Sequence, residues 1–264
     1  MPLNRLMVFT DFTLASNVAA AHCYQIASLS KSEVISLHMI SDDEDLEWAE
    51  KKSAEQISKI ENYDKSISFK PIASGQSLFS GMNKWLIDQE VGLTFMATHG
   101  KKDLQFVTGS SALKLIFNSE APMVVVQQNT QLRPYNHILI PLFSHQAEMH
   151  FPVDVLQSII RLFGSKITLL TPLIENEKEK EKMQKTVAWI KGILEVDTAD
   201  IQVKSSDESG KKLTNAVMSL VKEEDIDLIA VLIGAKHHRV EVEKWKKFYQ
   251  KVITNESNVP VLCL

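Results

Sequence analysis

The strongest constraint on the fold of this chain is an alternation of short apolar runs with amphipathic stretches, and the sequence passes through it twice. Short continuous apolar runs are typical of strands that are buried on both faces of a parallel sheet. The stretches between them carry apolar residues at helical spacing, which predicts a helix after each strand. The alternation therefore predicts an α/β protein in which helices cover both faces of a parallel sheet.

In the first half we predict five strands, at residues 6–9, 34–40, 67–73, 93–97 and 123–126. The helices predicted between them cover residues 15–29, 42–63, 77–89 and 110–117. The second half repeats this order, with strands predicted at residues 137–140, 167–170, 201–203, 228–233 and 259–264. Its helices are marked by apolar positions within residues 156–163, 183–194, 213–220 and 242–252. The pattern thus predicts two open, parallel, five-stranded sheets in tandem.

Two landmarks align the halves with each other. Val8 in the first predicted strand corresponds to Ile140, and Pro122 before the fifth strand corresponds to Pro260. We therefore predict two copies of one domain, residues 1–130 and residues 135–264. The polar linker between them, at about residues 129–136, is short enough to keep the halves packed together.

The composition excludes several classes of protein. Lys and Arg number 29 against 33 Asp and Glu, so the formal charge is -4, whereas a nucleic-acid-binding surface needs a basic excess. No apolar stretch reaches the roughly 18 residues of a membrane span, and the first residues lack the pattern of a signal peptide. Cys23 and Cys263 are too few for a disulfide framework, which favours a reducing compartment. We predict a cytoplasmic protein that binds neither nucleic acid nor membrane.

Ligands of open parallel sheets bind beyond the carboxyl ends of the strands, and four segments of the first half lie there. These segments are Thr10-Asp11, His38-Met39, residues 96–100 and Gly109-Ser110-Ser111. Gly109 lets the backbone approach a ligand, and the N–H groups of the helix that follows favour an anion such as phosphate. Lys101 and Lys102 add positive charge nearby, and Asp11 could accept hydrogen bonds from ribose hydroxyls.

The same residues also have purely structural interpretations. A Gly-Ser pair at a helix start is often only an N-cap, and Asp11 could cap the helix that follows its strand. His99 before Gly100 is an ordinary kind of loop residue. The adjacent His237 and His238 have no acidic or Cys partners at ligand spacing, so we predict no metal site there.

The segment THG-KKDLQFVT-GSS between two strands, with Asp11-Phe12-Thr13 after the first strand, resembles the universal stress protein family. That family has five parallel strands in each domain, in a Rossmann-like fold of the adenine nucleotide alpha hydrolase-like kind. Some members bind ATP through a Gly-x-x-Gly-x9-Gly-Ser/Thr loop. The resemblance in fold covers nearly the whole chain, which resembles a tandem universal stress protein with two domains related by a pseudo-two-fold axis. The nucleotide motif covers the first half alone.

The resemblance implies a set of cofactor contacts in the first half. The family's adenine and ribose contacts correspond to Thr10, Asp11 and Met39. Its contacts from the fourth strand and the loop after it correspond to Met96, Ala97, His99 and Gly100. Its phosphate contacts correspond to Gly109, Ser110 and Ser111. The cofactor implied is ATP, bound together with Mg²⁺ or Mn²⁺.

The chain departs from the family motif in both halves. Ala97 stands where the motif has its first glycine, and the spacer at residues 101–108 is one residue shorter than the family's nine. In the second half Phe143 stands at the position of Asp11, and no Gly-Ser pair marks a phosphate-binding helix start. We therefore predict that the second half is degenerate and structural.

Three functions remain to be compared. The first is a stress-response protein, a pseudo-dimer within one chain, which binds ATP or a related nucleotide in its first half and signals to an unknown protein partner. Such a chain could also form a homodimer. The second is an interaction scaffold in which both sites are inactive. The third is a hydrolase, but the chain has neither a Walker-type nor a Gly-x-Ser-x-Gly motif, so we predict no catalytic residues and at most slow ATP hydrolysis.

Overall fold

The computed structural model describes residues 3–39, 46–60, 69–74, 82–98, 115–143, 151–194, 200–209, 212–233 and 239–264. The chain divides into two compact units, Met1–Leu132 and Arg133–Leu264, which we call unit 1 and unit 2. The division falls within the polar segment 129–136. Each unit is described below by itself.

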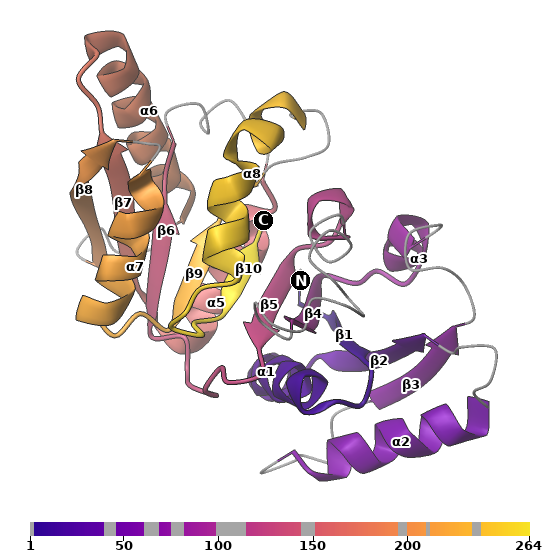
Figure 1. The fold of residues 1–264 in the computed structure, drawn as a ribbon. Helices are drawn as coiled ribbons and strands as arrows, with labels where there is room; N and C mark the ends of the chain where they lie inside the picture. The colour runs from indigo at the N-terminus through magenta and orange to yellow at the C-terminus, as the bar shows by residue number, and fades with distance from the viewer. Residues whose placement is uncertain are drawn as a thin grey trace. The chain divides into compact units, whose positions relative to one another are not determined.

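Unit 1 has a parallel sheet whose strands alternate with helices along the chain. Its elements are β1 (Arg5–Thr10), α1 (Leu14–Ser30), β2 (Glu33–Met39), α2 (Leu46–Ser58), β3 (Phe69–Ser74), α3 (Met82–Asp88), β4 (Leu93–Thr98) and β5 (Met123–Gln127). The strands lie in the order β3-β2-β1-β4-β5, and each neighbouring pair is parallel (Figure 1). The connection direction reverses between β1 and β4, and open sheets of this kind bind ligands at that point of their carboxyl edge.

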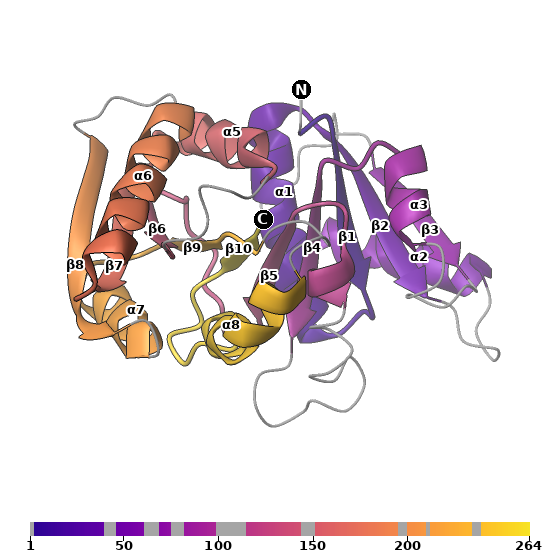
Figure 2. The same cartoon turned by 90° about the horizontal axis from the view of Figure 1, so that it is seen from above.

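Unit 2 repeats this topology. Its elements are β6 (His137–Pro141), α5 (Val153–Phe163), β7 (Lys166–Leu173), α6 (Glu177–Leu194), β8 (Ile201–Ser209), α7 (Leu213–Glu223), β9 (Leu228–Val231), α8 (Arg239–Ile253) and β10 (Val261–Cys263). The strand order β8-β7-β6-β9-β10 is that of unit 1 element for element. Figure 2 shows α5 and α6 over one face of this sheet and α7 and α8 over the other. The predicted α/β fold, with five parallel strands and covering helices, is confirmed for each unit.

The two proline landmarks occupy the same structural position. The N–H of Thr94 donates to the carbonyl of Pro122 at 2.8 Å in unit 1, and the N–H of Ile229 donates to the carbonyl of Pro260 at 3.0 Å in unit 2. Each bond joins the fourth strand of a unit to the residue that precedes its fifth strand. Since these prolines need no N–H of their own there, they start a strand without removing a ladder bond.

Apolar strands explain why the sheets form. In unit 1 the side chains of β1 and β2 pack with α3, with the turn after it and with the residue pair before β5. The cluster is made of Met7, Ile35, Leu37, Leu86, Val91 and Ala121, with Phe9 and Trp85 against it. In unit 2 the residues of β6, β9 and β10 are buried almost without exception. Burying an aliphatic side chain fully contributes about 1.5–3 kcal/mol, so these strands are the main source of stability in each unit.

The helix after the first strand ends in the same way in both units. The residue after α1 is Lys31, with φ 58°, and the residue after α5 is Gly164, with φ 62°. Both lie in the left-handed region, and the N–H of each donates back to a carbonyl in the last turn of its helix. The two helices begin differently: Thr13 caps α1 with its side chain, whereas the residue before α5 is Pro152, which makes no side-chain cap.

Three details of the structure differ from what the sequence pattern led us to expect. Strand β8 runs from Ile201 to Ser209, well beyond the predicted end at residue 203. Its later residues are polar, and it lies at the end of its sheet beside β7, so its pairing rather than an apolar pattern defines it. Leu29, the last apolar residue of the helix predicted at residues 15–29, is 49% exposed, although Ala27 in the same turn is fully buried. Tyr135, in the linker expected to be polar, is fully buried.

Some predicted elements fall partly or wholly outside the described residues. The helix predicted at 110–117 is described only at residues 115–118, which are helical. The helices predicted at 42–63 and 77–89 are described as α2 and α3, without their flanking residues. Within the described part of the chain, no helix is long and apolar enough to cross a membrane. Cys23 and Cys263 are both buried and unbridged.

Candidate functional site

The predicted site residues divide into two groups. Five of them lie at the carboxyl ends of β1, β2 and β4 in unit 1, namely Thr10, Asp11, Met39, Met96 and Ala97. The other five lie outside the described residues, namely His99, Gly100, Gly109, Ser110 and Ser111. The base and ribose side of the predicted site can therefore be examined in the structure, whereas the predicted phosphate loop stays a prediction.

Asp11 begins the turn that leads from β1 into α1. Its Oδ1 atom accepts hydrogen bonds from the N–H of Thr13 at 3.1 Å and from the hydroxyl of Thr13 at 2.6 Å. Thr13 in turn accepts the N–H of Ser16 at 3.3 Å and is the N-cap of α1. The carboxylate of Asp11 is held in one place by this turn, and its side chain remains exposed at the edge of the sheet. Asp11 thus shapes the helix start, as one of the structural interpretations expected, although Thr13 is the capping residue.

An aromatic cluster lies beside Asp11, and sequence reasoning missed it. The ring of Phe12 lies 4.4 Å from that of His38 and 5.6 Å from that of Trp48, measured between centroids. Phe12 has φ 60°, a left-handed conformation that is rare for a bulky residue and occurs mostly at turns and functional sites. Trp48, in the first turn of α2, is 41% exposed. The cluster joins the turn after β1 to β2 and α2.

The buried ring of His38 is held by the end of β1. Its Nδ1 atom lies 2.8 Å from the carbonyl oxygen of Thr10. Because a carbonyl can only accept, Nδ1 carries the proton in this contact. The His38 side chain therefore fixes the last residue of β1 against β2, in addition to the strand ladder that pairs Thr10 with His38.

Gln56 of α2 links three elements beneath the Asp11 turn. Its Oε1 atom accepts the hydroxyl proton of Thr10 at 2.8 Å, and its Nε2 atom donates to Asn17 Oδ1 at 2.7 Å and to Ser16 Oγ at 3.2 Å. Gln56, Thr10 and Ser16 are all buried. A buried polar network whose members are hydrogen-bonded makes the local arrangement rigid. No sequence motif marked Gln56, because its partners come from β1 and α1.

The fourth strand contributes little side-chain surface to this edge. Met96 is 3% exposed, so its side chain belongs to the interior. Ala97 and Met39 are half-buried, at the ends of β4 and β2. The hydroxyl of Thr98, the last residue of β4, is 3.4 Å from the carbonyl oxygen of Val126 on β5. If β4 contacts a ligand, the contact is made by Ala97 and by the backbone rather than by the Met96 side chain.

The corresponding place in unit 2 has a different character. Phe143, which stands at the position of Asp11, is 3% exposed and packs edge-on against Phe248 of α8 at 5.1 Å. Leu142 before it is fully buried. Where unit 1 presents an exposed carboxylate, unit 2 presents an aromatic ring covered by its own helix. Among the described residues of both units, no group of three or more His, Cys, Asp or Glu could hold a metal ion.

This chain is similar to known proteins in its three-dimensional structure, whereas comparisons of its sequence find no match. No protein-family model matches the sequence, and no curated protein does. A universal stress protein from Archaeoglobus fulgidus DSM 4304 superposes with a TM-score of 0.71 at 15% identity, covering 99% of this chain and 98% of that one. The chain has the fold of the universal stress proteins.

Two further solved structures agree with this assignment of the fold. A universal stress protein described as putative, from Pseudomonas aeruginosa UCBPP-PA14, has a TM-score of 0.65 at 13% identity and is covered to 92%. A functionally unknown protein from Pseudomonas aeruginosa PAO1 has a TM-score of 0.66 at 12% identity, also with 92% of its length covered. In each case nearly the whole of this chain is matched, so the universal stress protein fold extends over both units. The resemblance predicted from the Asp-Phe-Thr and Gly-Ser-Ser segments is therefore confirmed for the fold.

Proposed function

We propose that this chain is a cytoplasmic regulatory protein of the universal stress type, which binds ATP or a related nucleotide at the carboxyl edge of the unit 1 sheet. The observation that carries the proposal is the exposed carboxylate of Asp11, held at the end of β1 by Thr13. A fixed carboxylate there suits the paired hydroxyls of a ribose, because charge-assisted hydrogen bonds are stronger than neutral ones. The fold supports the location, since open sheets bind ligands at this edge.

The contrast between the units supports a single site. Unit 2 repeats the topology of unit 1, yet it has the buried ring of Phe143 in place of the carboxylate. A burial of this kind leaves no polar group for a ribose at that position. We therefore place the nucleotide in unit 1 and give unit 2 a structural role.

Calorimetry with a matched pair of variants tests this proposal. The chain, first freed of any carried-over ligand, is titrated with ATP up to millimolar concentration. We expect Asp11→Asn to weaken ATP binding about tenfold, the effect of losing one charge-assisted hydrogen bond, while its amide oxygen keeps the turn with Thr13. Asp154→Asn, which removes an exposed carboxylate from the first turn of α5 in unit 2, is the control and should leave the affinity unchanged. Absence of binding by the unaltered chain, or equal affinity of both variants, would refute the proposal.

The second candidate is a scaffold that binds no nucleotide, and the Gln56 network favours it. The hydroxyl of Thr10 is hydrogen-bonded to Gln56, and the Phe12, His38 and Trp48 rings contact one another, so these groups have partners within the protein itself. Thermal unfolding separates the two candidates, because a ligand that binds the native state alone raises the Tm. An unchanged Tm in excess ATP would favour the scaffold.

A further inference from the structure

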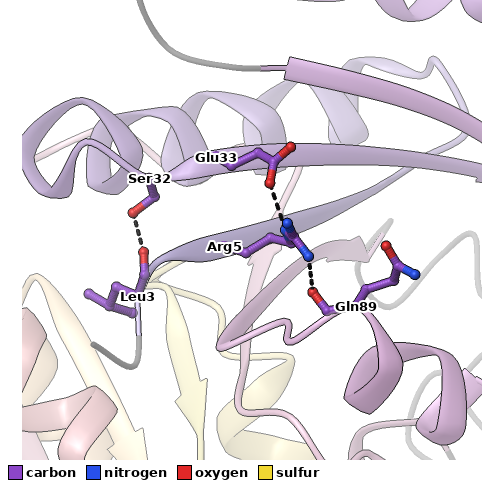
Figure 3. A network of polar contacts seen from close by, with 5 residues as sticks. All are labelled: Leu3, Arg5, Ser32, Glu33 and Gln89. Atoms are coloured by element: carbon purple, nitrogen blue, oxygen red, sulfur yellow. Dashed lines mark hydrogen bonds and ion pairs between the residues drawn. The ribbon is translucent and has the colours of Figure 1, made fainter.

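A polar clamp closes the amino edge of each sheet, opposite the candidate site. In unit 1 it is made by Arg5, the first residue of β1 (Figure 3). The Nε atom of Arg5 donates to Glu33 Oε2 at 2.7 Å, and its Nη1 atom donates to the carbonyl of Gln89, just after α3. The clamp thus joins β1, β2 and the turn before β4.

His137 takes the place of Arg5 in unit 2. The carbonyl of Arg5 accepts the N–H of Gly92 at 2.9 Å, and the carbonyl of His137 accepts the N–H of Asp227 at the same distance. Both bonds connect the first residue of the first strand to the turn before the fourth strand. The two side chains therefore occupy equivalent positions, one always charged and the other able to lose its proton.

The His137 ring makes two hydrogen bonds that define its protonation. Its Nδ1 atom lies 3.1 Å from the carbonyl oxygen of Glu224, and its Nε2 atom lies 2.8 Å from the hydroxyl of Thr168. The carbonyl can only accept, so Nδ1 carries the proton and Nε2 accepts from Thr168. The main-chain N–H of His137 also donates to Asp227 Oδ2 at 3.0 Å. The neutral ring thus joins β6 to β7 and to the turn before β9.

A second proton does not fit this arrangement. It would turn Nε2 into a donor facing the hydroxyl of Thr168, whose own proton would then need another acceptor at a fully buried position. The charged groups around the ring are Lys166 on β7, Lys204 on β8, Asp225 and Asp227 before β9, Glu224 in an ion pair with Lys204, and Arg133 near Asp227. Burial, followed by the charge of Lys166, lowers the pKa of His137, and Asp227 opposes this shift.

We propose that His137 is a pH-sensitive clamp, which holds the amino edge of unit 2 closed when its ring is neutral and releases it on protonation. The sign follows from the hydrogen bonds. When its hydrogen bonds to Glu224 and Thr168 are broken, the His137 ring takes up a proton with the ordinary pKa of about 6.5. When these hydrogen bonds are formed, the ring binds a proton less readily. Opening therefore becomes more favourable as the pH falls below that value. Arg5 keeps the equivalent clamp of unit 1 closed over the same range.

Hydrogen exchange of the full chain, followed by NMR at pH 7.5 and 5.5, tests the clamp. After correction for intrinsic exchange, we expect the protection factor of the Asp227 amide to be up to about tenfold lower at pH 5.5 than at pH 7.5. This limit follows from an opened state in which His137 has the ordinary pKa of about 6.5. In His137→Gln, whose amide donates and accepts without titrating, this fall should disappear. The Gly92 amide in unit 1 is the internal control, and its behaviour should be the same in both proteins.

Two outcomes would overturn the proposal. If the fall at Asp227 persisted in His137→Gln, it would belong to another group, such as the carboxyl of Asp227, whose pKa burial raises. A direct titration of the His137 ring by NMR covers the case in which the variant does not fold. Proton on Nδ1 and a midpoint below the ordinary pKa support the clamp; a midpoint at or above that value, or the other tautomer, refutes it.

Discussion

A chain that lacks residues 259–264 will fail to fold its second unit. These residues include β10 (Val261–Cys263), and Val261, Leu262, Cys263 and Leu264 are all at most 7% exposed. Burying three large aliphatic side chains contributes on the order of 5–9 kcal/mol, which is comparable with the whole stability of a domain of this size. The deletion therefore removes most or all of the free energy that keeps unit 2 folded.

The backbone of β10 adds to this loss. Its ladder pairs Val261 with Ile229 and Cys263 with Val231 on β9. Beyond the ladder, the N–H of Ile233 donates to the carbonyl of Leu264 at 2.7 Å. Without β10 these groups of β9 lose their partners at buried positions, which costs further free energy.

Circular dichroism and two-dimensional NMR spectra of the shortened chain measure the effect. We expect lost helical signal and collapsed chemical-shift dispersion for residues of unit 2. Leu262→Ala gives an intermediate case, with a loss of about 2–5 kcal/mol, whereas Leu173→Ala, at a residue that is 48% exposed, should change stability by less than about 0.5 kcal/mol. A shortened chain that melts cooperatively at the Tm of the full chain would show that β10 is dispensable.

Acid will destabilise unit 1 through His22. This residue of α1 is fully buried, and burial lowers the pKa of its ring to about 4 from 6.5, although a hydrogen bond to the backbone of Gln131 opposes the shift. Between these two values the unfolded chain binds a proton that the folded chain does not, so stability is complete above pH 6.5 and is lost as the pH falls toward 4. The shift corresponds to about 3 kcal/mol.

Urea unfolding of the full chain and of His22→Leu at pH 7.5 and pH 4.5 measures this contribution. The variant cannot titrate at position 22, so its stability relative to the unaltered chain should improve by up to about 3 kcal/mol as the pH falls. Contributions of the other histidines are present in both proteins and cancel. Parallel pH profiles for the two proteins would contradict a buried neutral His22.

Periodicity was sufficient for most of the fold. Short continuous apolar runs such as Leu6–Phe9 predict strands that are buried on both faces. Between these runs, apolar residues at helical spacing predict helices that pack one face against the sheet. The correspondence of Pro122 with Pro260 identifies the repeat in the sequence, and the same hydrogen bond is found at both prolines. Strand β8 was the clearest failure, because a polar strand at a sheet edge carries no apolar signal.

The candidate site was predictable only in part. Asp11 was found because the carboxyl edge of an open sheet is defined by topology, which the sequence pattern predicts. Gln56 and Trp48 were not found, since each acts through contacts with residues distant in the chain. His38 was placed at this edge by the sequence, but its hydrogen bond to the carbonyl of Thr10 was not predicted. Asp11 also proved to hold the start of α1 through Thr13, a contact two residues away that a sequence can suggest but not establish.

The sequence by itself determined the repeated α/β topology, the position of the carboxyl edge that carries the candidate site, and the presence of Phe143 at the place of Asp11 in the second half. These features follow from local apolar periodicity and from residue identity at aligned positions. Only the tertiary structure decided which polar groups meet: Gln56 with Thr10 at one edge, and His137 with Thr168 and Glu224 at the other. Hydrogen bonds act over about 3 Å, and only the folded chain brings residues far apart in sequence to that distance.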